Sequence, residues 1–565
     1  MPPANFIWPD LITPWLFAPV TKLLGLIVLI NVLGKLARKF VFVPTLTILD
    51  DLPNFAQKRK DDKIAGRAVI CGGSVAGLIS AAVCSLHFDS VLVIEPEGGV
   101  LELGMDIPKE RQFRTLPNGL QTLIPLRKRV AQYLAPHVFM PPLILGLERL
   151  FPEALKPEMA YFGFSFAPLS YSFNYGNRAS PLAFTTTDPK TPRTLPIMRP
   201  SFETLLRRLV VKTCGNVTFM VGTVDGFTRH EEDSNKISGV SVRESDPITG
   251  DFIIDATGSA QLSYHKWLKN AGFGPLPPSL HVEYNPQLTY SQSIYKIPKN
   301  LLPKIEAILP KGLIQGPIYA NTPDSSTGER RTLYLFLHED QQVMLMCGGR
   351  GLSAEDRPLT ASEFRTYTKS LHHSEVTPGW IYELFDILEA HEAECDAWYA
   401  VVHPGKLAYI KYHEAESGAL PSNWVAIGDS MVKLNPIYGQ GCGKAMMDVV
   451  ALDKLLRGLP SRHAIPDGFS TKFFRKAITR TQGMWNNNKA HDYGWQTTEP
   501  AKGETLENGA FLREFSRNLL YAGEKCHSLH ATFMLTSWGM APKTDLFAPS
   551  ILARVGWQWL TDRWN

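Results

Sequence analysis

The chain has 565 residues, 58 Lys and Arg against 54 Asp and Glu, and 44% hydrophobic residues. This near-neutral charge, without a basic block interleaved with aromatic residues, argues against a nucleic-acid partner. The seven cysteines are odd in number and lack metal-ligand spacing, which argues against a disulfide framework and a zinc site.

The first 45 residues differ in composition from the rest of the chain. From Pro14, about 20 mostly apolar residues lead to Lys35, Arg38 and Lys39, near the length of a bilayer-crossing helix. We expect residues 1–45 to form a membrane anchor, in the endoplasmic reticulum, with the remainder on the cytoplasmic side because the basic cluster follows the helix. An amphipathic or buried N-terminal helix is the alternative.

A nucleotide-binding unit is predicted after a polar linker at residues 46–66. Residues 68–71 and 90–95 are apolar and typical of strands buried on both faces, with a small-residue helix expected at 78–86. A strand, helix and strand of this length form the βαβ unit of dinucleotide-binding folds.

The turn between the first strand and the helix is Gly72-Gly73-Ser74-Val75-Ala76-Gly77, with Ser74 in place of the second glycine of G-x-G-x-x-G. Gly72 is expected to make the tight bend and Gly77 to let helix and strand pack closely. Ser74 could donate to a phosphate at the helix N-terminus, and Glu95 could accept from a ribose hydroxyl. The alternative is a tight loop that merely needs glycine.

Later segments predict two further regions. An amphipathic helix at residues 199–210 and a buried strand within 250–260 extend the nucleotide-binding unit, and alternating runs within 280–410 indicate a mostly antiparallel sheet. We expect the substrate to lie under this sheet, which offers Tyr290, Tyr295, Tyr334 and Phe336. The alternative is that these residues belong to the core. The last 75 residues are apolar and Trp-rich, which fits either buried helices or a surface that enters the membrane interface.

A second motif indicates which nucleotide is bound. After an apolar strand at 424–427 come Asp429, Pro436 and Gly439-Gln440-Gly441, which lead into a helix at 444–456. This stretch resembles the second FAD fingerprint of single-component (class A) flavoprotein monooxygenases. It is nearest to the fungal secondary-metabolite tailoring branch and similar in plan to squalene epoxidase. The resemblance implies that Asp429 binds the ribityl chain and that Pro436, Gly439, Gln440 and Gly441 lie against the isoalloxazine.

Other stretches resemble the same family. They imply that Arg129 and Gln132 lie near the flavin, that Arg199 supports FAD and that the backbone of Val224 touches adenine. From the residues alone, Arg199 could equally be a helix-start cation in an ion pair. His137 is expected to be a packed loop histidine rather than a catalyst.

The predicted fold class is α/β: a discontinuous Rossmann-like FAD-binding domain, an inserted mostly antiparallel sheet domain and a helical C-terminal region. The expected boundaries are 1–45 (anchor), 46–66 (linker), 67–275 and 416–460 (FAD-binding), 276–415 (substrate sheet) and 461–565 (C-terminal helices).

The resemblance implies an FAD-dependent monooxygenase that uses NADPH or NADH. Through a C4a-hydroperoxyflavin, it would insert one oxygen atom from O₂ into a lipophilic molecule such as a polyketide or terpenoid, by epoxidation or hydroxylation. Tyr438 and Gln132 are the polar candidates for a catalytic role. An FAD-dependent reductase or dehydrogenase of the same fold and a non-enzymatic escort-type protein are the alternatives. The oligomeric state is not predicted.

Overall fold

The computed structural model describes residues 13–562, except 60–61, 103–111, 117–118, 131, 186–187, 259–263, 314, 354–355, 373 and 461–463. Its centre is a five-stranded parallel sheet, in the order β21-β13-β1-β2-β9. The strands are β1 (Ile64–Cys71), β2 (Phe88–Glu95), β9 (Val217–Val221), β13 (Phe252–Asp255) and β21 (Trp424–Ala426).

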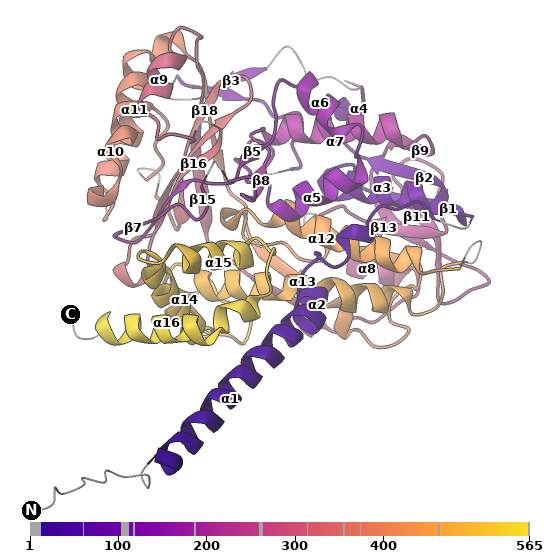
Figure 1. The fold of residues 1–565 in the computed structure, drawn as a ribbon. Helices are drawn as coiled ribbons and strands as arrows, with labels where there is room; N and C mark the ends of the chain where they lie inside the picture. Colours follow the sequence, from indigo (N-terminus) through magenta and orange to yellow (C-terminus); the bar gives the residue numbers. More distant parts are fainter. Residues whose placement is uncertain are drawn as a thin grey trace, which may run out of the picture.

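Helices cover the parallel sheet because its strands are apolar on both faces. The side chains of Val69, Ile70 and Ile254 are fully buried, as expected of an all-parallel sheet. Helix α3 (Val75–His87) packs on β1, β2 and β9, and α7 (Arg199–Thr213) and α12 (Gly441–Arg457) pack on α3. Three further helices lie around them: α5 (Pro141–Leu150) against α12, α6 (Leu155–Tyr161) against α7, and α8 (Tyr264–Asn270) against the strand at Val224–Arg229 (Figure 1). The predicted βαβ unit is confirmed, with β1 beginning four residues earlier than the expected strand.

A seven-stranded, mostly antiparallel sheet stands beside the parallel one, in the order β19-β15-β18-β17-β16-β6-β7. Its strands are β6 (Ser172–Tyr175), β7 (Arg178–Ser180), β15 (Leu288–Lys296), β16 (Gly316–Thr322), β17 (Arg331–His338), β18 (Gln342–Arg350) and β19 (Asp396–Val402). Three helices cover its outer face: α9 (Leu302–Ile308), α10 (Ala361–Lys369) and α11 (Gly379–Ala390) (Figure 1).

The two faces of this sheet carry different side chains because residues alternate along each strand. Tyr295 belongs to the cluster under the outer helices, whereas Tyr290 and Ile294 lie on the inner face. The prediction that Tyr295 covers the substrate with Tyr290 is therefore wrong. The two residues are an odd number of positions apart on β15, so their side chains point to opposite faces of the sheet. The alternating pattern alone does not say which of the two faces is the inner one.

Short strands and helices complete the two layers. The strands are β3 (Phe113–Thr115), β4 (Gln121–Leu123), β5 (Ala167–Pro168), β8 (Arg193–Thr194), β10 (Val224–Arg229), β11 (Ile237–Val242), β12 (Ile248–Thr249), β14 (His281–Tyr284) and β20 (Leu407–Ile410), and the short helices are α2 (Val43–Leu46) and α4 (Gly99–Glu102). The C-terminal region is helical, as predicted: α13 (Phe469–Asp492), α14 (Ala510–Gly523), α15 (His527–Ser537) and α16 (Pro549–Asp562). The predicted α/β fold class is confirmed.

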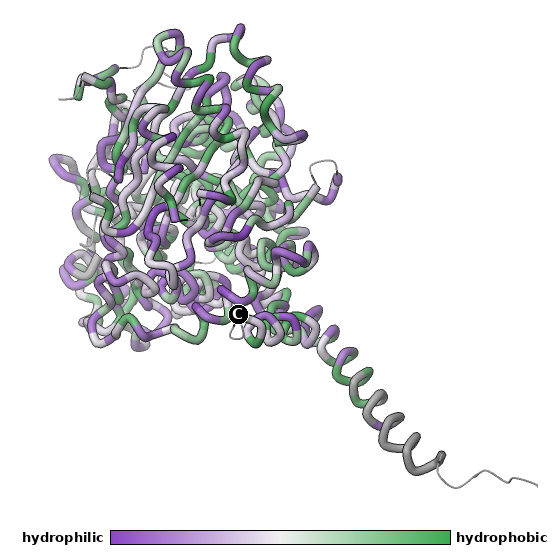
Figure 2. Tube along the Cα trace, turned by 90° about the vertical axis from the view of Figure 1, so that its left-hand side faces the viewer, coloured by the Kyte–Doolittle hydropathy of each residue, from purple (hydrophilic) through white to green (hydrophobic). Residues whose placement is uncertain are grey.

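The N-terminal helix α1 (Thr13–Ala37) projects away from the body of the molecule (Figures 1 and 2). A π-helical turn, η1 (Arg38–Phe42), joins it to α2. Within the described residues, no helix has both the length and the apolar character needed to cross a bilayer. The membrane anchor expected in residues 1–45 stays a prediction.

The segment predicted as a polar linker, 46–66, is packed onto the core. Ile48 is fully buried and Phe55 is 2% exposed. Asp51, also buried, accepts hydrogen bonds from Lys454 Nζ at 2.6 Å and from Arg480. This carboxylate joins the start of the folded chain to α12 and α13.

We expect Asp51→Asn to lower stability at neutral pH by about 3 kcal/mol, because it leaves the buried Arg480 without its counter-charge. Burial alone would raise the pKa of Asp51, but hydrogen bonds from Lys454 and Arg480 outweigh it and lower the pKa. The ion pairs therefore stabilise the fold above the ordinary pKa of the carboxyl and are lost as pH falls through the lowered value. Thermal unfolding of the unmodified protein and of Asp51→Asn at several pH values should show unfolding temperatures that approach each other as the pH falls. The exposed neighbour gives the control, since Asp50→Asn should change stability by less than about 0.5 kcal/mol.

Candidate functional site

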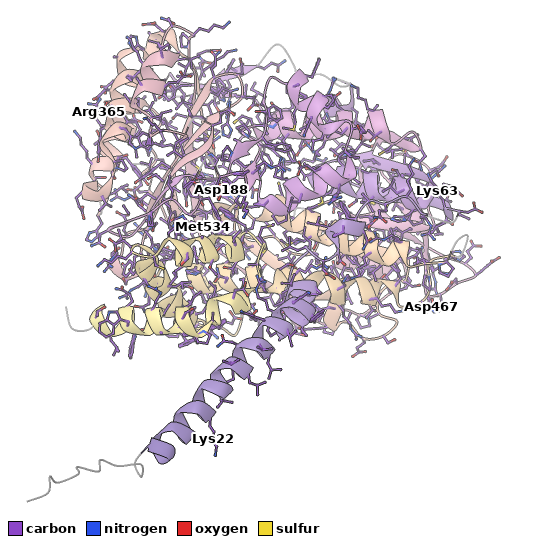
Figure 3. All side chains as sticks on the ribbon, viewed as in Figure 1. Lys22, Lys63, Asp188, Arg365, Asp467 and Met534 are labelled. Atoms are coloured by element: carbon purple, nitrogen blue, oxygen red, sulfur yellow. The ribbon has the colours of Figure 1, made fainter. Side chains whose placement is uncertain are left out.

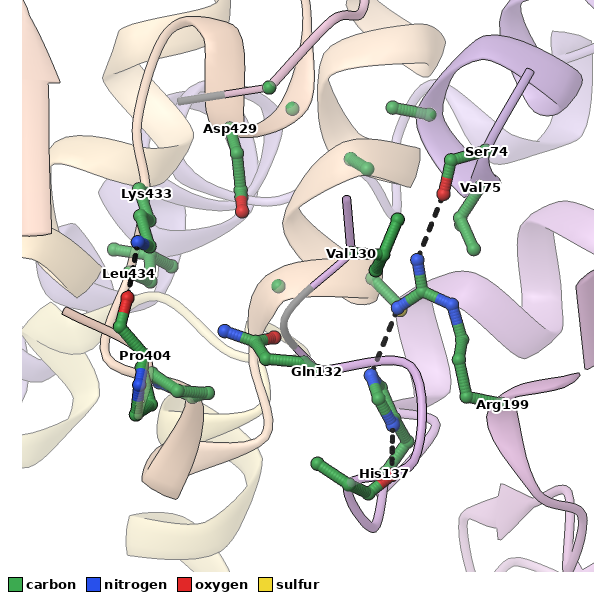
Figure 4. Close-up of a pocket in the computed structure, with 18 of the residues that line it drawn as sticks. Ser74, Val75, Val130, Gln132, His137, Arg199, Pro404, Asp429, Lys433 and Leu434 are labelled. Carbon is green, nitrogen blue, oxygen red and sulfur yellow. Dashed lines mark hydrogen bonds between the residues drawn. The ribbon is translucent and has the colours of Figure 1, made fainter. Parts of the chain in front are cut away.

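A cavity of about 590 Å³ lies between the carboxyl ends of the parallel strands and the inner face of the seven-stranded sheet. In open α/β folds, ligands bind at the carboxyl ends of the strands. Segments far apart in sequence form its walls: the β1–α3 turn, the stretch around 127–140, the start of α7, the chain around 428–445 and strands of the sheet (Figure 4).

The glycine turn is built as predicted at its first and last positions. Gly72 has a φ of +109°, and a Cβ there would lie 2.6 Å from the carbonyl oxygen of Ala256. A Cβ on Gly77 would lie 1.8 Å from the carbonyl oxygen of Gly72, so only glycine fits. Gly72, Ser74 and Val75 line the cavity, and α3 begins there, which directs its free N–H groups toward a bound anion.

Ser74 has a different role from the predicted one. Its hydroxyl donates to Glu203 Oε1 at 2.8 Å and accepts from Arg199 Nη2 at 3.0 Å (Figure 4). A serine hydroxyl has one proton, and here that proton is directed to a carboxylate rather than to a phosphate. Ser74 therefore joins the turn to α7.

Glu95 closes the turn from the end of β2. Its fully buried carboxylate accepts from the N–H groups of Gly73 at 2.7 Å and Glu97 at 3.0 Å, and from Arg127 at 2.8 Å. An ionised carboxylate offers about four acceptor positions. One position therefore stays available to a further donor.

Arg127 is the functional residue that the sequence did not reveal. It is 4% exposed, lines the cavity, and pairs with Glu95, with Glu97 at 3.0 Å and with Glu203 at 2.7 Å. The resemblance pointed instead to Arg129, which also lines the cavity but is exposed. No local pattern marks Arg127, because Glu203 is 76 residues away in sequence and comes near it only in the fold.

Arg199 and His137 form the floor beside this cluster (Figure 4). Arg199 donates to Glu203 Oε1 at 2.7 Å and to His137 Nε2 at 2.9 Å, so the ion-pair interpretation of Arg199 is confirmed. Burial alone would raise the pKa of Glu203, but Arg199 and Arg127 outweigh it and lower the pKa to about 2. Burial and the charge of Arg199 lower the pKa of His137 to about 3, so its imidazole is neutral and acts as an acceptor.

Asp429 faces this cluster across the cavity and is exposed within it (Figure 4). It follows Gly428, whose φ is +68°. The Gly428 carbonyl accepts from Lys444 Nζ at 2.6 Å, and its N–H donates to Asp448 Oδ2 at 3.2 Å. Lys444 and Asp448 are 2.9 Å apart and fully buried. This ion pair in α12 therefore holds the peptide that aims Asp429.

A turn at Pro436, Tyr438, Gly439 and Gly441 lines the middle of the cavity. Gly439 has a φ of +67°, and a Cβ there would lie 3.1 Å from the Cε atom of Met140. Gln440 differs from the prediction. It does not line the cavity, and its amide donates to the carbonyl of Ser537 in α15 at 2.8 Å.

Asp492, the last residue of α13, anchors this turn from behind. Its buried carboxylate accepts from Asn435 at 2.8 and 3.0 Å, from Arg350 at 2.6 Å and from the hydroxyl groups of Tyr284 at 2.8 Å and Tyr438 at 3.3 Å. The guanidinium of Arg350 also lies 3.6 Å from the ring centre of Trp495. The hydroxyl of Tyr438 is thus held in a charged network.

The sheet end of the cavity is an aromatic chamber, lined by Tyr171, Tyr290, Tyr334, Phe336 and Met346. The hydroxyl of Tyr290 is buried and has no hydrogen-bond partner among the described residues. Leaving such a group unpaired costs about 1–3 kcal/mol, so this hydroxyl is a candidate partner for a polar atom of a ligand in the chamber.

The remaining predicted residues divide between wall and support. Gln132 and Val224 line the cavity, whereas Gly73 and Gly77 stand behind the turn that they shape. Asp255 also stands behind the wall, where its carboxylate accepts from Thr257 at 2.7 Å and from Ser430 at 3.0 Å.

Comparisons with known proteins identify the fold. No protein-family model and no curated protein matches the sequence. The flavoprotein/dehydrogenase from Cytophaga hutchinsonii has 10% identity and a TM-score of 0.51, over 88% of this chain and 100% of that one. The flavin-dependent brominase Bmp2 has 13% identity and a TM-score of 0.49 (89% and 100% covered), and PqsL from P. aeruginosa, in complex with 2-aminobenzoylacetate, has 13% and 0.49 (75% and 95%). The first of these likenesses shows that the chain shares a flavoprotein fold.

We expect Lys444→Met to lower stability by about 3–5 kcal/mol, because Asp448 would keep a buried charge without a partner. Thermal unfolding measures this loss.

The double variant Lys444→Met/Asp448→Leu should regain much of the stability, since two apolar side chains replace both charges. It should still bind FAD more weakly than the unmodified protein, because nothing then holds the Gly428 peptide. Full FAD affinity in the double variant would contradict the positioning role.

Proposed function

We propose that this protein is an FAD-dependent monooxygenase that uses NADPH or NADH and inserts one oxygen atom from O₂ into a lipophilic small molecule, such as a polyketide or terpenoid. The single observation that carries the proposal is the continuity of the cavity. Nucleotide-binding features line one end and an aromatic chamber forms the other. Ligand sites that are mostly apolar with a few convergent polar groups are typical of cofactor enzymes.

The residues present fit FAD. The α3 N-terminus and the glycine turn suit the pyrophosphate, Glu95 has an acceptor position for a ribose hydroxyl, and Asp429 suits the ribityl hydroxyl groups. The turn that includes Gly439 and Gly441 presents backbone without side chains to the ring system. Bound FAD would supply electron transfer and O₂ activation, while the protein supplies position, shielding and electrostatics.

The chain's own contribution is a dry, oriented chamber. Tyr171, Tyr334, Phe336 and Met346 exclude water from the substrate, which protects reactive species from side reactions. The unpaired hydroxyl of Tyr290 supports a substrate that has one polar oxygen or nitrogen on an otherwise apolar skeleton. Tyr438 and Gln132 lie at the cavity wall, where the hydroxyl of the first or the amide of the second could hydrogen-bond to the reacting groups.

An FAD-dependent dehydrogenase or reductase is the second candidate. The observation in its favour is the fold shared with the C. hutchinsonii flavoprotein/dehydrogenase. The same cavity could remove or add hydride without inserting oxygen. The two functions differ in where the oxygen of the product originates.

Labelled O₂ separates them. The purified protein with FAD, NADPH and a panel of terpenoids and polyketides should give a product that carries one labelled oxygen atom. A product without the label would favour the dehydrogenase. A colourless protein that takes up no FAD would contradict both.

Asp429→Ala should weaken FAD binding by about tenfold or more, because a hydrogen bond to a charged group is worth roughly 1.5–3 kcal/mol. Fluorescence quenching of added FAD measures the affinity. Asp225→Ala is the matched control, since Asp225 is exposed and outside the cavity wall. Equal FAD affinity in both variants would rule out the assigned role of Asp429.

Tyr290→Phe should raise KM for the substrate by roughly tenfold while FAD affinity stays unchanged, because it removes one ligand hydrogen bond in a dry site. Steady-state kinetics with the substrate identified by oxygen labelling gives KM. Tyr295→Phe, on the other face of β15, should leave KM unaltered. An unchanged KM in Tyr290→Phe would show that its hydroxyl does not contact the substrate.

A further inference from the structure

Exposed apolar side chains gather on two elements from opposite ends of the chain. On α1 and the turn that follows it, the exposed residues are Leu26, Val28, Leu29, Ile30, Val32, Leu33, Leu36, Phe40 and Val41. On α16 and just before it they are Phe547, Leu552, Trp557 and Leu560. Large exposed apolar patches on soluble folds mark sites of interaction.

The two elements lie on one side of the molecule. Arg38, at the base of α1, pairs with Asp545 at 2.9 Å, just before α16. In Figure 1, α16 lies along the side from which α1 projects. The opposite face of α16 is used for packing, since Val555 clusters with Leu519 and Leu529. Its outer face, with Trp557 70% exposed, is therefore the one available to a partner.

Exposed basic residues lie beside this surface, while Asp545 is paired with Arg38 and Glu514 accepts from Trp559. Lys35 and Lys39 are exposed near the base of α1, and Arg554 is exposed on α16. Basic residues beside an apolar helix attract anionic lipid headgroups, and tryptophan favours the headgroup level. Lys22 lies toward the far end of α1 (Figure 3). Its flexible aliphatic side chain can extend so that the ammonium group reaches the boundary between lipid and water.

A bilayer fits α1 better than a second copy of the chain does. Successive helical residues point about 100° apart, so Val28, Leu29 and Ile30 face three directions, and all three are at least half exposed. A partner helix would cover one stripe and leave the others in water. Lipid surrounds a helix on all sides.

We propose that α1 and the outer face of α16 form one docking surface for a phospholipid bilayer with anionic headgroups. The helix α1 enters the bilayer, and α16 lies flat at its surface. The proposal rests on exposed side chains and charge, and not on the proposed enzymatic function. Neither element lines the cavity, so docking and FAD binding can be tested separately.

Flotation of the full-length protein with vesicles tests the proposal. The protein should float with phosphatidylcholine vesicles that contain phosphatidylserine, and less with phosphatidylcholine alone or at high salt, because salt screens the basic residues. Leu29→Glu/Leu33→Glu in α1 and Trp557→Glu/Leu560→Glu in α16 should each lower the partition coefficient by roughly tenfold or more, the cost of removing a buried apolar side chain from lipid.

Val211→Glu is the matched control, because Val211 is an exposed apolar residue on α7, and this variant should float like the unmodified protein. FAD uptake by every variant would show that each is folded. Failure of the unmodified protein to float would overturn the proposal, and so would α1 and α16 variants that float as well as the unmodified protein. So would a dimer without vesicles that the same substitutions dissociate, since the surface would then join two copies of the chain.

Discussion

The cavity depends on one buried cluster of charges. Arg127 and Arg199 meet the carboxylates of Glu95, Glu97 and Glu203 at the glycine turn. A buried charge without its partner is strongly destabilising. The end of β2, the segment around Arg127 and the start of α7 therefore stabilise one another. The nucleotide end of the cavity forms as a unit. The low pKa of Glu203 keeps the cluster charged at physiological pH.

A second ion pair performs the same task on the opposite wall. Lys444 and Asp448 hold both polar groups of the Gly428 peptide. The conformational entropy of the backbone at Gly428 is lost when the protein folds and not when a ligand binds. Asp429 is therefore already oriented before a ligand arrives. Preorganisation of this kind raises affinity without adding contacts. Both walls of the site are thus fixed by charges that the ligand itself need not touch.

Local sequence patterns predicted the fold well, because they report on burial and turns. The apolar strands and the glycine turn were placed correctly, and Asp429, Pro436, Gly439 and Gly441 of the second motif line the cavity, whereas Gln440 does not. The patterns missed what depends on distant partners. Arg127 and Lys444 are ordinary cations in sequence, and their roles arise from carboxylates and carbonyls brought near by folding. The segment 46–66 looked like a linker because its composition is polar, and its buried apolar residues, Ile48, Leu52, Phe55 and Ile64, stand among charged and polar ones.

Asp492 has a consequence for how this chain can vary. One carboxylate from the C-terminal helices receives hydrogen bonds from β14, β18 and the turn at the middle of the cavity. The C-terminal region therefore cannot be removed or exchanged as an independent module, even though Asp492 lines none of the cavity. Changes that adapt the outer helices to a different environment must leave this one position intact. The outer C-terminal helices are thus free to vary in sequence, whereas the position of Asp492, at the end of α13, is not.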